Sequence, residues 1–226
     1  MSPSHEPASL RMGVMAGRAV AVLSLAYAAI LAIGLLTLPA PDQPIQNPWF
    51  TLLEVLILAI APAMVALMAA FHAWAPAEGK AMAVLGIAFM GMCAVLTCSV
   101  HFAVLTLSPQ PAFSTGDWPS LVFAFRWPSV AYALDILAWD VFFPLAAVCA
   151  AFSLRGAGLS ALVRGLLFAS AGFAFAGLAG VPLANMSVRN VGIIGYAVLF
   201  PFAAALSAVI FRRAMATASA PEVDRR

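Results

Sequence analysis

Three acidic residues and one histidine lie inside long apolar stretches of this sequence. Glu54 lies in "LEVLILAIAP", His101 in "SVHFAVLTL", and Asp135 and Asp140 in "AYALDILAWDVFF". An ionisable side chain at the centre of a membrane helix costs about 2.5–3.5 kcal/mol on insertion scales, so it normally faces a bundle interior and marks a functional site. Carboxylates and histidines also donate and accept protons in catalysis. Glu54, His101 and Asp135 are therefore candidate acid/base residues or ligand anchors.

The composition indicates that these residues belong to a membrane protein. Of the 226 residues, 64% are hydrophobic and 9% are charged, and the mean hydropathy is +1.02. Soluble domains average about 45–50% apolar and about 25% charged residues. A spanning helix needs about 20 mostly apolar residues. The sequence predicts an all-α fold, a polytopic membrane helix bundle of six transmembrane helices: Ala19–Leu38, Trp49–Trp74, Ala81–Leu107, Pro128–Leu154, Leu162–Ala184 and Val191–Phe211.

The basic residues predict the orientation of this bundle, because Lys and Arg favour the cytoplasmic side. With both termini inside, the outer side keeps only Arg126 and Arg189. The cytoplasmic side then collects all the others: Arg11, Arg18, Lys80, Arg155, Arg164, Arg212, Arg213, Arg225 and Arg226. We expect an N-in/C-in domain over residues 19–213, with disordered cytoplasmic tails over 1–18 and 214–226.

The longest connection joins the third and fourth spans and holds Trp-Pro-Ser twice, at Trp118 and Trp127. Proline suits the first turn of a helix, and tryptophan suits the membrane interface. We therefore expect a short interfacial helix over Pro119 to Phe125. Two roles remain open for it, a lid over a site or an anchor in the interface.

The polar residues inside four spans share one depth in the membrane. At a rise of 1.5 Å per residue, Glu54, His101, Asp135 and Tyr196 each lie about 8–10 Å in from the outer end of their spans. Their common depth predicts one pocket in the outer leaflet. Further candidates for ligand binding lie near it, on the same helix face or just above: Tyr132, Trp139, Asn185, Arg126 and Arg189.

Asp140 is a separate case. It follows Asp135 by five residues, which places the two side chains roughly 140° apart around an α-helix. We therefore expect Asp140, also a ligand-binding candidate, to bind a neighbouring helix or to extend a polar path inward.

Other site classes have little support in the sequence. A zinc site could use only Glu54, His101 and Asp135 at this depth, and hydrogen bonding for packing is the simpler role for His101, so no metal is expected. No phosphate-binding G-x-x-x-x-G-K-[ST] motif or G-x-S-x-G motif is present, and no cofactor is expected. The net charge of +2 reflects topology, so we expect no nucleic-acid partner.

Small residues repeat at a spacing of four in the fifth span, at Gly172, Ala176 and Gly180. Such a stripe lets another helix approach closely in a membrane. This face is the one through which a homo-oligomer would form.

Four segments carry a resemblance to known sequences. "LEVLILAIAP", "SVHFAVLTL", "WPSVAYALDILAWDVFF" and "NVGIIGYAVLFPFAA" together resemble a family of bacterial six-span integral-membrane proteins of unknown function, over roughly Ala19 to Arg213. The resemblance implies the fold and a multi-pass location in the bacterial inner (plasma) membrane. It implies no activity.

Three classes of function remain open from the sequence. The first is a protein that binds, or acts on, a membrane lipid or small apolar ligand, with Glu54, His101 and Asp135 as polar anchors and Tyr196 as a hydrogen-bond partner. The second is a proton- or cation-coupled transporter, which needs a polar path past Asp140. The third is a structural or assembly protein, in which these residues form interhelical hydrogen bonds.

Overall fold

Long helices account for most of the residues that the computed structural model describes, 7–40 and 43–218, and these residues contain no strand. The longer helices are α1 (Pro7–Leu36), α2 (Trp49–Trp74), α3 (Lys80–Leu107), α4 (Val130–Ile136), α5 (Phe143–Ser153), α6 (Leu159–Leu178) and α9 (Phe200–Ala218). Shorter helical segments connect or extend them: η1 (Ala77–Gly79), η2 (Pro119–Phe123), η3 (Leu137–Phe142), α7 (Met186–Arg189), α8 (Val191–Ile193) and η4 (Ile194–Leu199).

Within the described residues, six helical rods are long and apolar enough to cross a membrane. Two are composite, because α4, η3 and α5 join into one rod and α7, α8, η4 and α9 into another. The six are Ala8–Leu36, Trp49–Trp74, Ala77–Leu107, Val130–Ser153, Leu159–Leu178 and Met186–Thr217. The prediction of six spans in an all-α fold is confirmed, and the chain is a multi-pass membrane protein by helix length and hydropathy.

The first helix is longer than predicted. It begins at Pro7, so the prediction of disorder up to residue 18 is wrong from Pro7 onward, and residues 1–6 lie outside the described part. Close packing explains the extension. A Cβ on Gly17 would lie 2.6 Å from the Ala204 carbonyl oxygen of α9, which shows how closely the two helices approach. At the other end of the chain, α9 continues through 214–218, where a tail was predicted, and residues 219–226 are outside the described part.

Two other helix boundaries differ from the prediction. The fifth span ends at Leu178 instead of Ala184, and the next helix begins at Met186 instead of Val191. The Asn185 side chain accepts hydrogen bonds from the backbone N–H groups of Ser187 (3.0 Å) and Val188 (3.3 Å). An asparagine in this position satisfies N–H groups that have no partner in the first turn.

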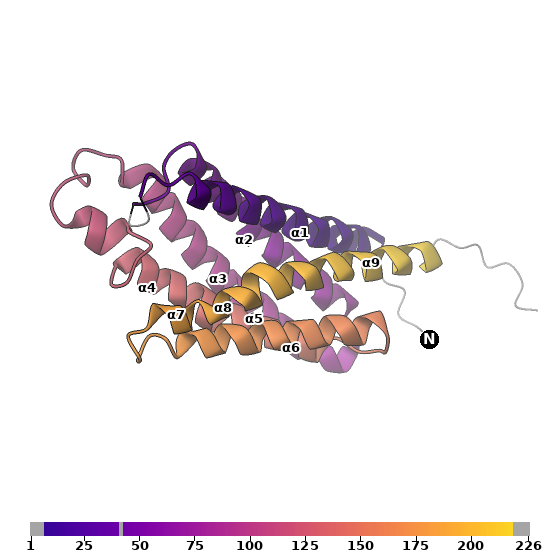
Figure 1. Ribbon diagram of the computed structural model, residues 1–226. Coiled ribbons are helices and arrows are strands. Elements are labelled where there is room, and N and C mark those ends of the chain that lie inside the picture. Colours follow the sequence, from indigo (N-terminus) through magenta and orange to yellow (C-terminus); the bar gives the residue numbers. More distant parts are fainter. Residues whose placement is uncertain (1–6, 41–42, 219–226) are drawn as a thin grey trace, which may run out of the picture.

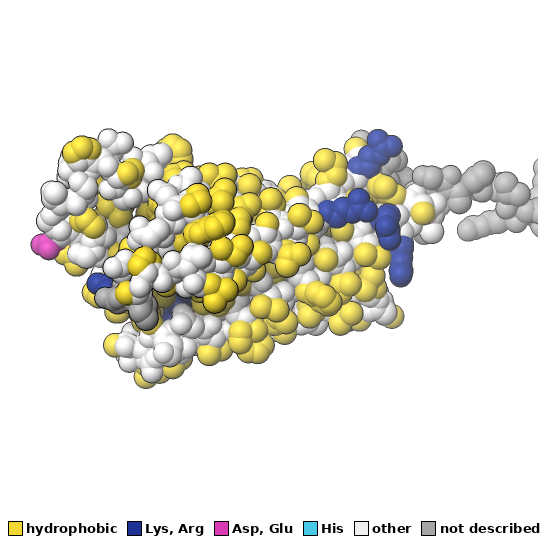
Figure 2. Space-filling model, turned by 45° about the horizontal axis from the view of Figure 1, so that its top comes forward, with side chains coloured by type: hydrophobic (Ala, Val, Ile, Leu, Met, Phe, Trp, Pro, Cys, Tyr) yellow, Lys and Arg dark blue, Asp and Glu magenta, His cyan; other side chains and the backbone are white. Residues whose placement is uncertain are grey.

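The rods form a bundle with two chemically different ends (Figure 1). Helix α1 packs against α2 and α9, α3 packs against α2 and α5, and α6 packs against α5, η4 and α9. Basic side chains gather at the end where α1 begins and α9 ends, which we call the basic end (Figure 2). The opposite end carries the loop with η2, and we call it the η2 end. Apolar side chains cover much of the surface between the two ends in Figure 2.

Two segments inside the spanning rods are π-helical. The segment η3 contains Asp140 and precedes Pro144, and η4 contains Tyr196 and precedes Pro201. Proline lacks the N–H that would bond the carbonyl four residues back. Single π-helical turns widen a helix locally and occur frequently at functional sites. Both segments face the polar site described next.

Candidate functional site

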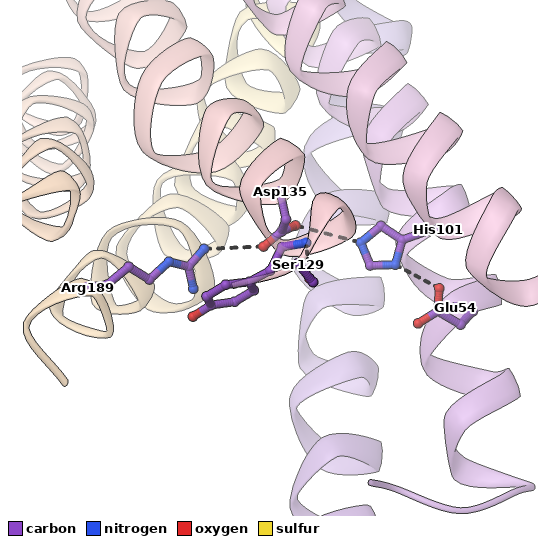
Figure 3. A network of polar contacts seen from close by, with 6 residues as sticks. Glu54, His101, Ser129, Asp135 and Arg189 are labelled. Carbon is purple, nitrogen blue, oxygen red and sulfur yellow. Dashed lines mark hydrogen bonds and ion pairs between the residues drawn. The ribbon is translucent and has the colours of Figure 1, made fainter. Parts of the chain in front are cut away.

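A chain of polar contacts crosses the bundle near the η2 end (Figure 3). It begins with a hydrogen bond of 2.8 Å between Glu54 Oε2 of α2 and His101 Nδ1 of α3. His101 Nε2 lies 3.8 Å from Asp135 Oδ1 of α4, a distance for an ion pair but too long for a hydrogen bond. The other oxygen of Asp135 accepts a hydrogen bond of 3.2 Å from Arg189 Nη2 of α7. Four segments that are distant in sequence therefore meet in one buried network.

Arg189 extends the network to a third carboxylate. Its Nε donates a hydrogen bond of 3.0 Å to Asp140 Oδ2 in η3, so a single guanidinium joins both aspartates of the fourth span. The guanidinium carbon also lies 5.0 Å from the centroid of the Tyr132 ring and 5.9 Å from that of Tyr196. Cations at such distances are attracted by the faces of aromatic rings. Arg189 is 4% exposed, which places it inside the bundle.

Glycines bring the backbone of Arg189 into this position. A Cβ on Gly177 of α6 would lie 2.7 Å from the Arg189 carbonyl oxygen, and one on Gly192 would lie 2.6 Å from Asp140 Oδ1. The hydroxyl of Ser170 donates a hydrogen bond of 2.8 Å to the Gly195 carbonyl oxygen. Because side chains are absent at these glycines, α6, α8 and η3 approach closely enough for Arg189 to reach both aspartates.

The loop with η2 closes over His101. The ring of Phe125 stacks on the imidazole of His101, with 4.7 Å between centroids and 22° between planes. Ser129 fixes the end of this loop, because its hydroxyl donates to the Ala124 carbonyl and accepts from the Tyr132 backbone N–H at the start of α4. A short helical turn occurs where the interfacial helix was predicted, although it is π-helical and ends at Phe123.

A cavity of about 790 Å³ borders the polar network. Its wall includes Glu54, His101, Asp135 and Arg189, while Asp140 lies outside the lining. Most other lining residues are apolar and come from α1, α2, the η2 loop, η3, α8, η4 and α9: among them Leu31, Leu35, Ile57, Ile60, Met64, Phe125, Trp139, Ile193 and Phe200. The site is therefore an apolar cavity with a charged patch on one wall.

All three tyrosines of the sequence line this cavity. Tyr27 comes from α1, Tyr132 from α4 and Tyr196 from η4. The ring of Tyr196 packs against Trp139 at 5.1 Å between centroids and against Phe143 at 6.0 Å. Phenol hydroxyls supply hydrogen-bonding groups on rings that are otherwise apolar.

The structure brings most of the predicted site residues together. Besides the network, the cavity is lined by Arg126, Tyr132, Trp139 and Tyr196. Asn185 is not among the lining residues; it caps α7 instead. Asp140 lies away from the cavity and binds a neighbouring helix through Arg189, one of the two roles expected for it.

Sequence reasoning missed three features of the site. Arg189 was expected just above the pocket, yet it is part of the network and joins both aspartates. Two aspartates in one span, with no cation at their depth, were the signal that a basic partner must reach them. Tyr27 was overlooked, although Ser24 and Tyr27 lie three residues apart in the otherwise apolar stretch from Ala19 to Leu36. The contact between Phe125 and His101 had no sequence signal, since it depends on the path of the loop.

The arrangement is suited to proton transfer. One nitrogen of His101 is held by the Glu54 carboxylate, the other lies 3.8 Å from an oxygen of Asp135, and the three residues all line the cavity. A histidine oriented in this way can exchange protons with a bound molecule. Among residues 7–40 and 43–218, no group of three or more His, Cys, Asp or Glu side chains has an arrangement that could hold a metal ion, so the zinc alternative gains no support.

The small-residue stripe of the fifth span is divided in the structure. Gly180 lies beyond the end of α6, where an added Cβ would come within 2.7 Å of the Asn185 carbonyl oxygen of the same chain. Gly172 and Ala176 are exposed, and nothing lies within 4 Å of a Cβ added to Gly172. The three residues therefore do not form one continuous outer face.

No protein-family model, curated protein or solved structure matches this chain. Its description as a multi-pass membrane protein comes from helix length and hydropathy. The resemblance to the bacterial six-span family stays a prediction.

Proposed function

We propose that this protein binds a lipidic or small apolar molecule in the cavity beside Glu54, His101 and Asp135. The observation that carries the proposal is an apolar cavity of about 790 Å³ with a buried charged network on one wall. Ligand pockets are typically about 300–1,000 Å³, mostly apolar, with a few convergent polar groups that fix orientation. Glu54, His101 and Asp135 would be the polar anchors, and Tyr196 a hydrogen-bond partner.

The proposal includes an orientation and a route of entry. The start of α1 and the end of α9 lie at the basic end, and positive charge favours the cytoplasmic side, so we place the basic end in the cytoplasm and the η2 end outside. Three residues that line the cavity are exposed: Leu35 on α1, Ile193 on α8 and Ala197 on η4. A ligand would enter there from the outer leaflet of the bacterial inner membrane.

The two alternatives have weaker support. A transporter needs a polar path toward the basic end, yet Asp140 is 0% exposed, and Phe143 and Phe200, both buried, lie against each other with 5.1 Å between ring centroids. A purely structural role accounts for the pairing of the carboxylates. It does not account for the cavity beside them or for three tyrosines on its wall.

Fluorescence quenching by a bromine-tipped dodecanol tests the proposal, because bromine quenches tryptophan and Trp139 lies on the cavity wall. Ala28 lines the cavity, whereas its exposed neighbour Ala29 does not. Ala28→Phe should place a phenyl ring in the cavity and obstruct binding, and Ala29→Phe is the matched control on the same helix. We expect saturable quenching in the wild type and in Ala29→Phe, and its loss in Ala28→Phe.

Trp139→Phe identifies the source of the signal, since the sequence contains five tryptophans. The saturable component should disappear in this variant. Equal quenching in Ala28→Phe and Ala29→Phe would show that the probe binds at the outer surface of the bundle, and the proposal would be abandoned.

A further inference from the structure

The buried network contains more acidic than basic groups. Glu54, Asp135 and Asp140 are three carboxyl groups, and His101 and Arg189 are two basic groups. With every group ionised, one negative charge remains; with His101 neutral, two remain. An uncompensated charge that is removed from water is costly in a protein interior. The network therefore favours a further positive charge near it.

When His101 is neutral, one excess negative charge lies on Glu54 and the other on the two aspartates that share Arg189. Arg189 is held between Asp135 and Asp140, so its charge is already shared by two carboxylates. Glu54 is 4% exposed and lines the cavity, and among the described residues its carboxylate is hydrogen-bonded only to His101. A cation in the cavity would therefore be attracted toward Glu54.

The remaining walls are suited to a cation attached to an apolar chain. Tyr27, Phe125 and Trp139 present aromatic rings to the cavity, and the faces of such rings attract ammonium groups. Arg126 is the one further basic residue among the lining residues that the structure describes, and it is exposed. Because Arg126 is exposed, solvent or lipid headgroups screen its charge more strongly than they screen the charges of the buried network.

We infer that the cavity takes an amphiphile whose head carries one ammonium group, with the ammonium beside Glu54 and the apolar chain along α1 and η4. This inference rests on the proposed function and adds the chemical class of the ligand. A proton held by one carboxyl group would also cancel the excess charge, and the cavity would then show no preference for a cation.

Three bromine-tipped dodecyl probes of equal chain length separate these cases: an amine, an alcohol and a carboxylate, compared at slightly alkaline pH. Binding is measured as the saturable quenching that Ala28→Phe removes. We expect the amine to bind about tenfold more tightly than the alcohol, a difference of about 1.4 kcal/mol, and the carboxylate to bind most weakly.

Glu54→Gln tests the position of the cation. Glutamine retains an oxygen that accepts a hydrogen bond from His101, so the fold should persist, which a melting temperature in detergent equal to that of the wild type would verify. The preference for the amine over the alcohol should fall to about twofold or less. Glu78→Gln is the matched control, because Glu78 lies in η1 at the basic end, is exposed and does not line the cavity.

The outcomes separate this inference from the proposed function. Saturable binding with equal affinity for the three probes, or with preference for the carboxylate, would overturn the ammonium inference and leave the proposed function standing. Absence of any saturable signal that Ala28→Phe removes would end both. Competition against the bromine-tipped amine then shows whether the ammonium group belongs to a lipid or to a free amine. Displacement by phosphatidylethanolamine but not by phosphatidylglycerol indicates a lipid headgroup, and displacement by neither lipid indicates a free amine. Equal displacement by both lipids overturns the inference.

Discussion

Arg189 holds the polar site together at the level of single residues. It donates to Asp135 and Asp140, lies over the rings of Tyr132 and Tyr196, and is almost fully buried. Asp140 Oδ1 is buried and accepts no hydrogen bond among the described residues, so the charge of Asp140 depends on Arg189 through its other oxygen. Removal of this guanidinium would leave two carboxylates without their shared cation.

Substitution of Arg189 by methionine should destabilise the protein strongly. Loss of one partner of a buried ion pair typically costs about 3–5 kcal/mol, because the other charge remains buried. We expect a large fall in the apparent melting temperature in detergent, and partial recovery when Asp140→Asn is added.

Arg126→Met is the control for this substitution. Arg126 is exposed, and exposed substitutions usually change stability by less than about 0.5 kcal/mol. If Arg189→Met melted at the same temperature as Arg126→Met and the wild type, Arg189 would not stabilise the fold through its two ion pairs.

At the level of secondary-structure elements, the site depends on the close approach of α6 to α8 and η4. Gly177 of α6 lies directly against the backbone of Arg189 and Gly192, and Ser170 bonds the Gly195 carbonyl. The π-helical segments η3 and η4 contain Asp140 and Tyr196, and the side chains of both residues contact Arg189. Small residues are a common means of close packing between membrane helices.

Gly177→Ala should separate these helices and weaken the site. The new Cβ would lie 2.7 Å from the Arg189 carbonyl oxygen and 2.8 Å from the Gly192 nitrogen, and both are backbone atoms that cannot rotate away. Overpacking of this kind costs about 1–3 kcal/mol. We expect a lower melting temperature together with weaker binding of the bromine-tipped alcohol.

Gly172→Ala on the same helix is the matched control. Nothing lies within 4 Å of its new Cβ, and alanine is a better helix former than glycine. Its melting temperature should be equal to or above that of the wild type. A fall as large as that of Gly177→Ala would mean that α6 does not tolerate any added methyl group, and the close contact with Arg189 would not be the cause.

The whole molecule is asymmetric along the axis of the bundle. Its basic end contains both described chain ends, and the η2 end contains the cavity, the polar network and the loop that closes over His101. This separation of charge from site is the basis of the proposed orientation, with the cavity in the outer leaflet.

Cysteine labelling in intact cells tests the orientation. Ser114 is exposed in the loop with η2, and Ala157 is exposed between α5 and α6 at the basic end. In a background where Cys93, Cys98 and Cys149 are replaced by alanine, a membrane-impermeant maleimide should label Ser114→Cys and spare Ala157→Cys. The reverse pattern would place the cavity in the cytoplasmic leaflet and refute the N-in/C-in orientation.

The sequence by itself determined the membrane class, the number of spans and most of the polar residues of the site. These properties follow from local features: runs of apolar residues, and ionisable side chains whose depth is set by the rise along a helix. The common depth of Glu54, His101 and Asp135 was enough to predict that they would meet. The second span even begins and ends at the predicted residues, Trp49 and Trp74.

Only the tertiary structure decided how the charges are paired and where the helices end. The reach of Arg189 to two aspartates depends on glycines in α6 and α8 and on a π-helical turn, and none of these contacts is encoded within one span. The extension of α1 to Pro7 likewise depends on its packing against α9. Contacts between segments far apart in the chain are set by the fit of whole surfaces, so the cavity and the stacking of Phe125 on His101 emerged only when the helices were assembled.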